Sequence, residues 1–350
     1  MHFVPPALYE PGNGLRLNRI RDLHNSQSMP VTEFGELAWS PDGKLLAAYS
    51  EYSHLVTVWD AAGGKVSEIR RGGVQVTGGG GTLEFLPDSK TLVTVATFES
   101  EEDSQYGLNL WNAKTGALER KIVTQSPGLR APASWPSKFA VSPDGQLVVT
   151  LRKQPPFLAA IYSTKTWQIE RRIEEATSRV GESVTFSPDI RWLAIGKIMG
   201  IVTLYDLADI DHLPVRTLEA YAPAAPMAMP GLAFSPDGKL LATAGAPAAR
   251  LAPGDEHDTV KIWNVADFSL VARFACDPFA ARALAWSPDG RYLAATMERR
   301  LGIFSLSNPQ HHAIVDLGGD LVNAVGFSPD GKFLAVAVGA TVSIFSISQQ

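Results

Sequence analysis

The feature that most constrains this chain is a short phrase that recurs seven times along it. Each copy has an apolar pair, an aromatic residue or its substitute, the tetrapeptide Ser-Pro-Asp-Gly or a variant of it, and a run rich in Leu and Ala. Five copies are clear and begin at Leu37, Phe139, Leu232, Leu284 and Val325; two are degenerate and begin at Leu83 and Val184. Successive copies are roughly 40 to 55 residues apart, a spacing typical of repeat arrays in which each unit packs on the next. We therefore predict one domain, residues 15–350, after a short leader, 1–14.

Each repeat predicts four short antiparallel strands. In one unit the strands are expected at Leu284–Trp286, Tyr292–Thr296, Leu301–Phe304 and Ala313–Leu317, with Ser287–Gly290 as the first turn. Pro presets φ in such a turn, Asp bonds to nearby backbone, and Gly takes the left-handed position. The second strand is apolar at consecutive positions, which indicates that both faces of the sheet are covered. Blades around an axis satisfy this pattern, so the sequence predicts an all-β, seven-bladed β-propeller.

The third strands end in an aromatic residue followed by Asp or Asn, and they resemble the strands of WD-repeat proteins. Such endings occur in Val56–Asp60, Leu108–Asn112, Val202–Asp206 and Val260–Asn264. The chain has no Gly-His dipeptide, and the position of the usual Asp before the third strand is taken by Ser53, Gln105, Met199 and Gly339. The resemblance is thus to a divergent member, whose blades we expect to cohere by apolar packing instead of a polar network. It implies a binding scaffold or adaptor.

The two ends of the chain are expected to meet. The last repeat stops near Ser346, so its fourth strand is missing, while Ile20–Leu23 precedes the first repeat at the spacing that Val215–Leu218 keeps before Leu232. Residues 17–24 are therefore predicted to form the outer strand of the seventh blade, which would remove open sheet edges. One turn is expected to differ, because Ile190 occupies the Gly position and a β-branched residue is costly at positive φ.

Length variation is concentrated in the connections at the rim opposite the Ser-Pro-Asp turns, the top face. These segments are 72–81, 98–106, 126–137, 220–230 and 246–258. A scaffold that holds one face constant and elaborates the other usually binds through the elaborated loops. Bulky and charged side chains there are candidates for a protein or peptide partner: Arg130, Trp135, Tyr221, Met227, Met229, Arg250 and His257. The alternative, in which these side chains fold back to cap the propeller, stays open.

Two other functions are alternatives. Arg70 and Arg71, within Ile69–Gly72, resemble the Arg-Arg-Gly signature with which one propeller family binds phosphoinositides, since paired guanidinium groups suit phosphate. A propeller enzyme, such as a metal-dependent hydrolase or lactonase, would need carboxylates or histidines converging on the channel. No pattern in the sequence predicts a catalytic residue, a metal site or a cofactor, because the acidic and His-containing stretches lack ligand spacing.

Charge and cysteine content restrict the remaining classes. A net charge of -5 and a pI near 5.8 disfavour binding to nucleic acid or to an anionic membrane. Cys276 is the only cysteine, so no intrachain disulfide is expected. With no signal-peptide pattern or long apolar run in this sequence, we expect a cytoplasmic, monomeric propeller that works within a complex.

Overall fold

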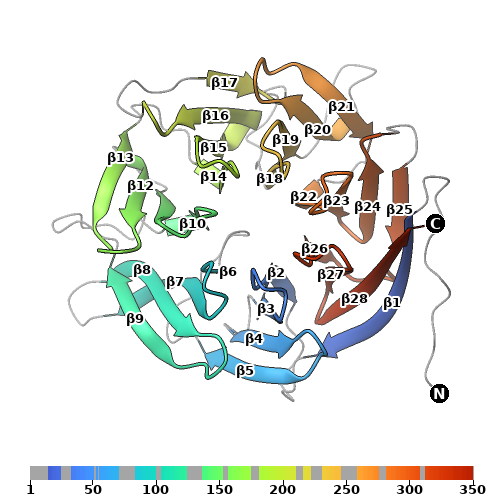
Figure 1. The fold of residues 1–350 in the computed structure, drawn as a ribbon, viewed down its shortest axis with the longest axis horizontal. Coiled ribbons are helices and arrows are strands. Elements are labelled where there is room, and N and C mark those ends of the chain that lie inside the picture. The colour runs from blue at the N-terminus through green and yellow to red at the C-terminus, as the bar shows by residue number, and fades with distance from the viewer. Residues whose placement is uncertain are drawn as a thin grey trace.

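Seven four-stranded sheets stand around a central axis, as Figure 1 shows. The computed structural model describes residues 15–24, 33–50, 53, 55–70, 83–99, 104–123, 136–152, 157–174, 181–209, 216–221, 231–245, 258–275, 281–307 and 312–349. Six of the sheets consist of four consecutive strands that pair antiparallel, with the first nearest the axis, and the seventh joins β26, β27 and β28 to β1. The predicted seven-bladed β-propeller is therefore confirmed.

In the first four blades, the strands run in chain order from the axis outward. Blade 1 contains β2 (Phe34–Trp39), β3 (Leu45–Ser50), β4 (Leu55–Asp60) and β5 (Lys65–Arg70). Blade 2 contains β6 (Leu83–Phe85), β7 (Thr91–Glu99), β8 (Ser104–Asn112) and β9 (Leu118–Val123). Blade 3 contains β10 (Pro136–Val141), β11 (Leu147–Arg152), β12 (Phe157–Ser163) and β13 (Ile169–Glu174). Blade 4 contains β14 (Gly181–Phe186), β15 (Trp192–Lys197), β16 (Ile201–Asp206) and β17 (Arg216–Glu219), with a 3-10 turn, Ile198–Gly200, between β15 and β16.

The last three blades follow the same plan. Blade 5 contains β18 (Gly231–Phe234), β19 (Leu240–Ala244), β20 (Asp258–Asn264) and β21 (Leu270–Ala275). Blade 6 contains β22 (Ala281–Trp286), β23 (Tyr292–Met297), β24 (Arg300–Ser305) and β25 (His312–Asp316). Blade 7 contains β26 (Val322–Phe327), β27 (Phe333–Val338), β28 (Thr341–Gln349) and, as its outer strand, β1 (Leu15–His24).

The ring closes where the prediction placed the closure. Strand β1 pairs antiparallel with β28, in a register that runs from Leu15 opposite Gln349 to His24 opposite Thr341. Leu15 and Leu17 are buried in the apolar cluster between blades 6 and 7, and Leu23 is buried in the cluster between blades 7 and 1. The first strand of the chain thus supplies both hydrogen bonds and core to its last blade.

The Ser-Pro-Asp turns are built from one repeated set of hydrogen bonds. In blade 1, the hydroxyl of Ser40 donates to Asp42 Oδ1 (2.7 Å) and accepts from the backbone N–H of Leu45 (2.9 Å). The backbone N–H of Lys44 also donates to Asp42 Oδ1 (3.1 Å). The same bonds recur in blade 5, where the hydrogen bond from Ser235 lowers the pKa of the Asp237 carboxyl. The Ser and Asp side chains therefore fix this turn in six blades, and in blade 2, where Leu86 replaces the serine, Asp88 alone accepts the bonds from Lys90 and Thr91.

The turn of blade 4 keeps this geometry, so the expectation that Ile190 would change it is wrong. Ile190 lies at φ 61°, close to the 69° of Gly43, and its N–H still donates to the carbonyl of Ser187 at 2.9 Å. The left-handed conformation costs a residue of this kind about 1–2 kcal/mol. The Ser187–Asp189 bonds and the packing of Ile190 on the apolar cluster of blades 3 and 4 hold the backbone there.

The same turns contact one another around the ring. A methyl group placed on Gly43, Gly238, Gly290 or Gly331 would lie 3.6 to 3.8 Å from the ring of the turn proline in the preceding blade. On Gly145 of blade 3 it would lie only 2.6 Å from Pro87 of blade 2. Turns of neighbouring blades thus approach each other at five joints, and of these the joint between blades 2 and 3 is the tightest.

This difference predicts unequal effects for two otherwise matched substitutions. Gly145 and Gly43 share a φ of +69°, so Ala at either position meets the same backbone strain, about 1 kcal/mol. Gly145→Ala also drives its methyl group into Pro87, which adds about 1–3 kcal/mol for overpacking. We expect Gly145→Ala to lower the free energy of unfolding in urea by clearly more than Gly43→Ala does. Equal losses of unfolding free energy in the two variants would contradict the tight packing of Gly145 against Pro87.

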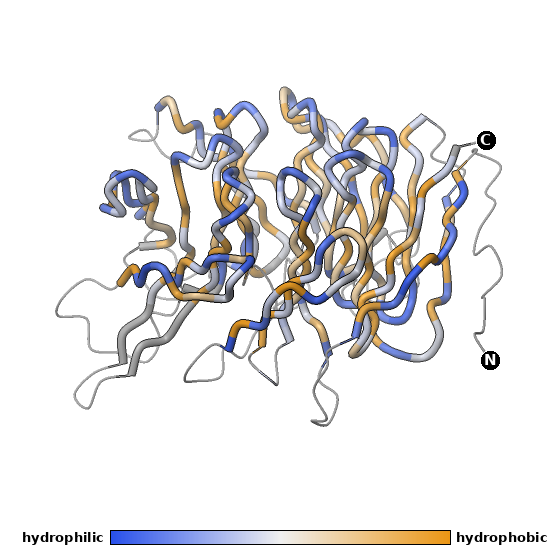
Figure 2. The backbone as a smooth tube through the Cα atoms, turned by 60° about the horizontal axis from the view of Figure 1, so that its bottom comes forward, coloured by the Kyte–Doolittle hydropathy of each residue, from blue (hydrophilic) through white to orange (hydrophobic). Residues whose placement is uncertain are grey.

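Apolar side chains fill the space between blades, and Figure 2 shows hydrophobic strand interiors beside hydrophilic turns. Buried side-chain hydrogen bonds also occur within blades 2 and 5. The indole N–H of Trp111 donates to Thr94 Oγ1 (3.0 Å), and that of Trp263 donates to Thr243 Oγ1 (3.1 Å). Each bond ties a third strand to a second strand. The expectation of cohesion by apolar packing in place of polar bonds is therefore incomplete.

Candidate functional site

The inner strands meet at joints that follow one rule. The residue just before the turn serine is usually aromatic, and the residue before that one is usually small. The indole N–H of Trp39 in blade 1 donates to the carbonyl of Gly326 in blade 7 (3.1 Å). In the same way, Trp286 of blade 6 donates to the carbonyl of Ala233 in blade 5 (3.0 Å). A large ring of one blade thus lies against a small residue of the preceding blade.

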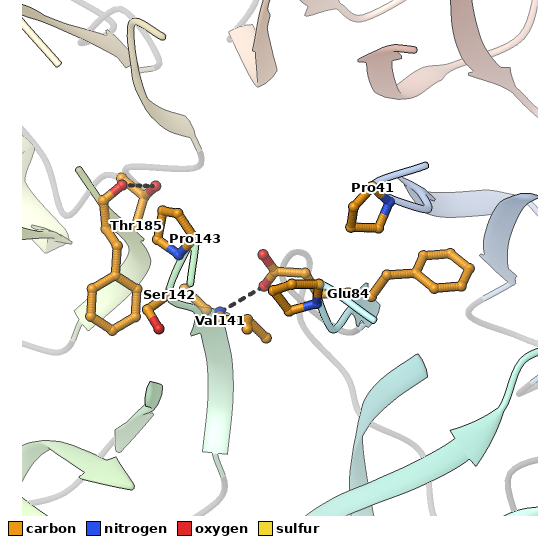
Figure 3. Close-up of a pocket in the computed structure, with 10 residues that line it drawn as sticks. Pro41, Glu84, Val141, Ser142, Pro143 and Thr185 are labelled. Carbon is orange, nitrogen blue, oxygen red and sulfur yellow. Dashed lines mark hydrogen bonds between the residues drawn. The ribbon is translucent and has the colours of Figure 1, made fainter. Parts of the chain in front are cut away.

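The joint between blades 2 and 3 reverses this rule. The small position of blade 2 holds Glu84, and the aromatic position of blade 3 holds Val141. The carboxylate of Glu84 reaches across the joint, and its Oε2 accepts a hydrogen bond from the backbone N–H of Val141 at 2.9 Å (Figure 3). A carboxylate therefore occupies the place where other joints have an aromatic ring.

A pocket of about 280 Å³ opens beside this carboxylate (Figure 3). It lies where the inner strands enter the Ser-Pro-Asp turns, and residues of four blades line it. They are Pro41, Glu84, Phe85, Pro87, Ala140, Val141, Ser142, Pro143, Thr185 and Phe186. Among these residues Glu84 alone is ionisable, and most of the wall is proline, phenylalanine and small aliphatic side chains.

The surroundings of Glu84 disfavour its charged form. Burial raises the pKa of the Glu84 carboxyl to about 8, and the nearby Glu36 carboxylate contributes in the same direction. The N–H of Val141 opposes the shift because it donates to the ionised carboxylate. When no ligand is bound, the Glu84 side chain is therefore mostly protonated at neutral pH.

Of the residues predicted to bind a partner, Tyr221 lies in the described part of the chain. Its hydroxyl donates to the carbonyl of Thr243 (3.0 Å), and the Lys261 ammonium lies 4.9 Å from the centroid of its ring. The partly buried ring packs on the apolar cluster between blades 4 and 5. This side chain is thus folded onto blade 5. The other candidates, Arg130, Trp135, Met227, Met229, Arg250 and His257, lie outside the described residues.

The Arg pair is described only in part. Arg70 ends β5 with an exposed side chain and pairs with Leu55 across the sheet, whereas Arg71 lies outside the described residues. Within the described ranges, no group of three or more His, Cys, Asp or Glu side chains could hold a metal ion. In that same part of the chain, no helix has the length and apolarity needed to cross a membrane.

Glu84 was missed by reasoning from the sequence, although a signal was present. Aligned on the turn serine, the other six blades have Ala38, Ala140, Thr185, Ala233, Ala285 and Gly326 at this position. A glutamate in a column of small residues, followed in the next blade by Val141 in a column of aromatic residues, marks one exceptional joint. Finding it required knowing that these two columns pack against each other.

Comparison with known proteins identifies one of the repeats. Residues 215–264 match the family described as WD40: WD domain, G-beta repeat. The matched segment contains β17, the outer strand of blade 4, and the first three strands of blade 5, so the sequence repeat is offset from the blade by one strand. A search of curated proteins found no match. Residues 215–264 are therefore a WD40 repeat, built into a seven-bladed β-propeller.

Proposed function

We propose that this propeller is a non-catalytic scaffold that binds a protein or peptide through its top face. The matched repeat belongs to a family that usually serves as a protein-binding scaffold, and a ring of closed blades is stiff enough to present loops in fixed positions. Binding then needs no rearrangement of the blades. A single copy of the chain would serve as one component of a complex.

The observation that carries the proposal is the difference between the two faces of the ring. On one face, the first and second strands are joined by turns of nearly constant sequence and hydrogen bonding. On the other face, the connection between blades ranges from 317–321 to 71–82, and the connection between second and third strands ranges from 339–340 to 245–257. Such elaboration over a constant frame is typical of a recognition surface.

Affinity capture with variants of the two faces tests this proposal. The top-face variant combines Arg130→Glu, Trp135→Ala and Arg250→Glu, while the matched control places Lys239→Glu and Lys332→Glu in the exposed turns of the opposite face. By mass spectrometry, we expect the parent and the control to capture the same partner in equal amounts. The top-face variant should capture at least tenfold less of that partner, since interface Trp and Arg often contribute about 2 kcal/mol or more to binding. Retention by the top-face variant with loss by the control would overturn the proposal.

A further inference from the structure

The pocket beside Glu84 has no role in binding at the top face, because it opens among the Ser-Pro-Asp turns at the opposite end of the inner strands. The two exceptional residues of the joint, Glu84 and Val141, both line it. At two other joints a Trp ring lies against the preceding blade, whereas here the smaller Val141 holds the position of the ring and the Glu84 carboxylate crosses the joint. The pocket therefore lies at the reversed joint, and residues of four blades line it.

The carboxylate retains capacity for a ligand. A carboxylate can accept about four hydrogen bonds, and the one recorded for Glu84 within the described residues comes from Val141 to Oε2. Ser142, which also lines the pocket, donates its hydroxyl to Asp144. The Oε1 atom of Glu84 is thus the strongest acceptor that the pocket offers to a donor arriving from solvent.

The charges around Glu84 favour a cation over an anion. Strand β2 brings the Glu36 carboxylate close enough to raise the pKa of Glu84. Strand β10 carries Lys138, which is buried at the strand position that Glu36 holds in β2, while β3 and residues 91–95 of β7 carry no charged residue. The nearby turn residues Asp42, Asp88 and Asp144 accept hydrogen bonds within their own turns. The charged side chain that acts on the Glu84 carboxyl is therefore that of Glu36, and no cationic residue lines the pocket.

We propose that this pocket binds an ammonium or guanidinium group carried on a short unbranched chain, with Glu84 as its counter-ion. The apolar walls formed by Phe85, Pro87 and Phe186 suit the methylene groups of such a chain, and the charged head meets Oε1. When the cation binds, Glu84 loses its proton to the solvent, so one proton is released for each cation bound. The ligand is a basic side chain of a protein segment or a free small amine of the same chemistry.

Isothermal titration calorimetry with butylguanidinium and with the peptide Gly-Gly-Arg-Gly-Gly tests the site, and neutral butylurea serves as the uncharged control. We expect saturable one-to-one binding that is about tenfold tighter at pH 9 than at pH 7, because the fraction of ionised Glu84 rises by about that factor while guanidinium stays charged. Release of about one proton at pH 7 should appear as a dependence of the heat on the buffer. If both probes bind, the head group suffices; if the peptide alone binds, the ligand is a protein segment.

Two variants make the test specific to Glu84. Glu84→Gln keeps an acceptor for Val141 and should lose both the binding and its pH dependence, whereas Glu219→Gln, at an exposed position of β17, should bind as the parent does. A thermal melt of each variant confirms that it is folded. The proposal is overturned if neither probe binds at pH 9, if butylurea binds equally well, or if Glu84→Gln binds both probes unchanged.

Discussion

A chain that begins at residue 25 is expected to lose its cooperative fold and to aggregate. The deletion removes β1, and with it the buried side chains of Leu15, Leu17 and Leu23, each of which contributes about 2–5 kcal/mol by its burial. The sum is comparable to the whole stability of a typical domain, about 5–15 kcal/mol. The deletion also leaves β28 with an unpaired edge, which can pair with another chain. Size-exclusion chromatography and a circular-dichroism melt measure both effects.

A shorter deletion is the matched control. A chain that begins at residue 14 keeps all of β1 and should melt as the parent does. Adding a synthetic peptide of residues 15–24 to the longer deletion should restore part of the lost cooperativity, because the pairing with β28 is antiparallel and does not require a covalent link. A cooperative melt of the longer deletion at the parent temperature, without peptide, would show that closure by β1 does not hold the ring.

Replacing Glu84 by Gln is expected to stabilise the protein at high pH and to leave it unchanged at low pH. The folded-state pKa of Glu84, about 8, lies above the ordinary value of 4.5, so the folded protein holds this proton over a range in which the unfolded chain has lost it. Folding stability therefore falls as pH rises from about 4.5 to about 8. Allowing for solvent screening in the open pocket, the loss amounts to about 3 kcal/mol. Gln does not ionise, so the Glu84→Gln variant does not undergo this loss of stability.

Urea unfolding at pH 5 and pH 9 measures this effect directly. At pH 5, just above the ordinary pKa of 4.5, Glu84→Gln should exceed the parent in free energy of unfolding by less than about 1 kcal/mol, because protonated Glu and Gln both offer an acceptor to Val141 and little of the loss has yet occurred. At pH 9 the variant should exceed the parent by about 3 kcal/mol, while Glu219→Gln should follow the parent at both pH values. Parallel curves for Glu84→Gln and the parent would mean that Glu84 ionises in the folded protein without cost.

The fold was predictable because its signals are local and repeated. The Ser-Pro-Asp-Gly turn specifies its own hydrogen bonds, and consecutive apolar residues such as Leu45–Ala48 require cover on both faces of a sheet. Closure was also predictable, since Ile20–Leu23 keeps the spacing of the other outer strands. The turns and strands depend on residues that are neighbours in sequence, and the closure depends on a spacing that is repeated along the chain.

The candidate site was not predictable in this way, because it depends on which positions of two blades meet. Glu84 and Val141 are far apart in sequence, and each looks unremarkable within its own repeat. The prediction about Ile190 failed for a related reason. Local preference opposes a β-branched residue at positive φ, but the bonds of the turn and the packing of blades 3 and 4 determine its conformation.

The pairing of β1 with β28 sets Leu15 opposite Gln349 in blade 7, where Figure 1 shows the two strands side by side. A short turn that joined them would convert β28 and β1 into an ordinary hairpin. New ends could then be opened between Gly318 and Gly319, where an added Cβ meets no atom within 4 Å and the chain passes from blade 6 to blade 7. In such a circular permutant every blade would be made from one continuous stretch of chain. The pairing of β1 with β28 is thus one way to close the ring, and we expect the same seven blades to form when the chain begins at a different blade.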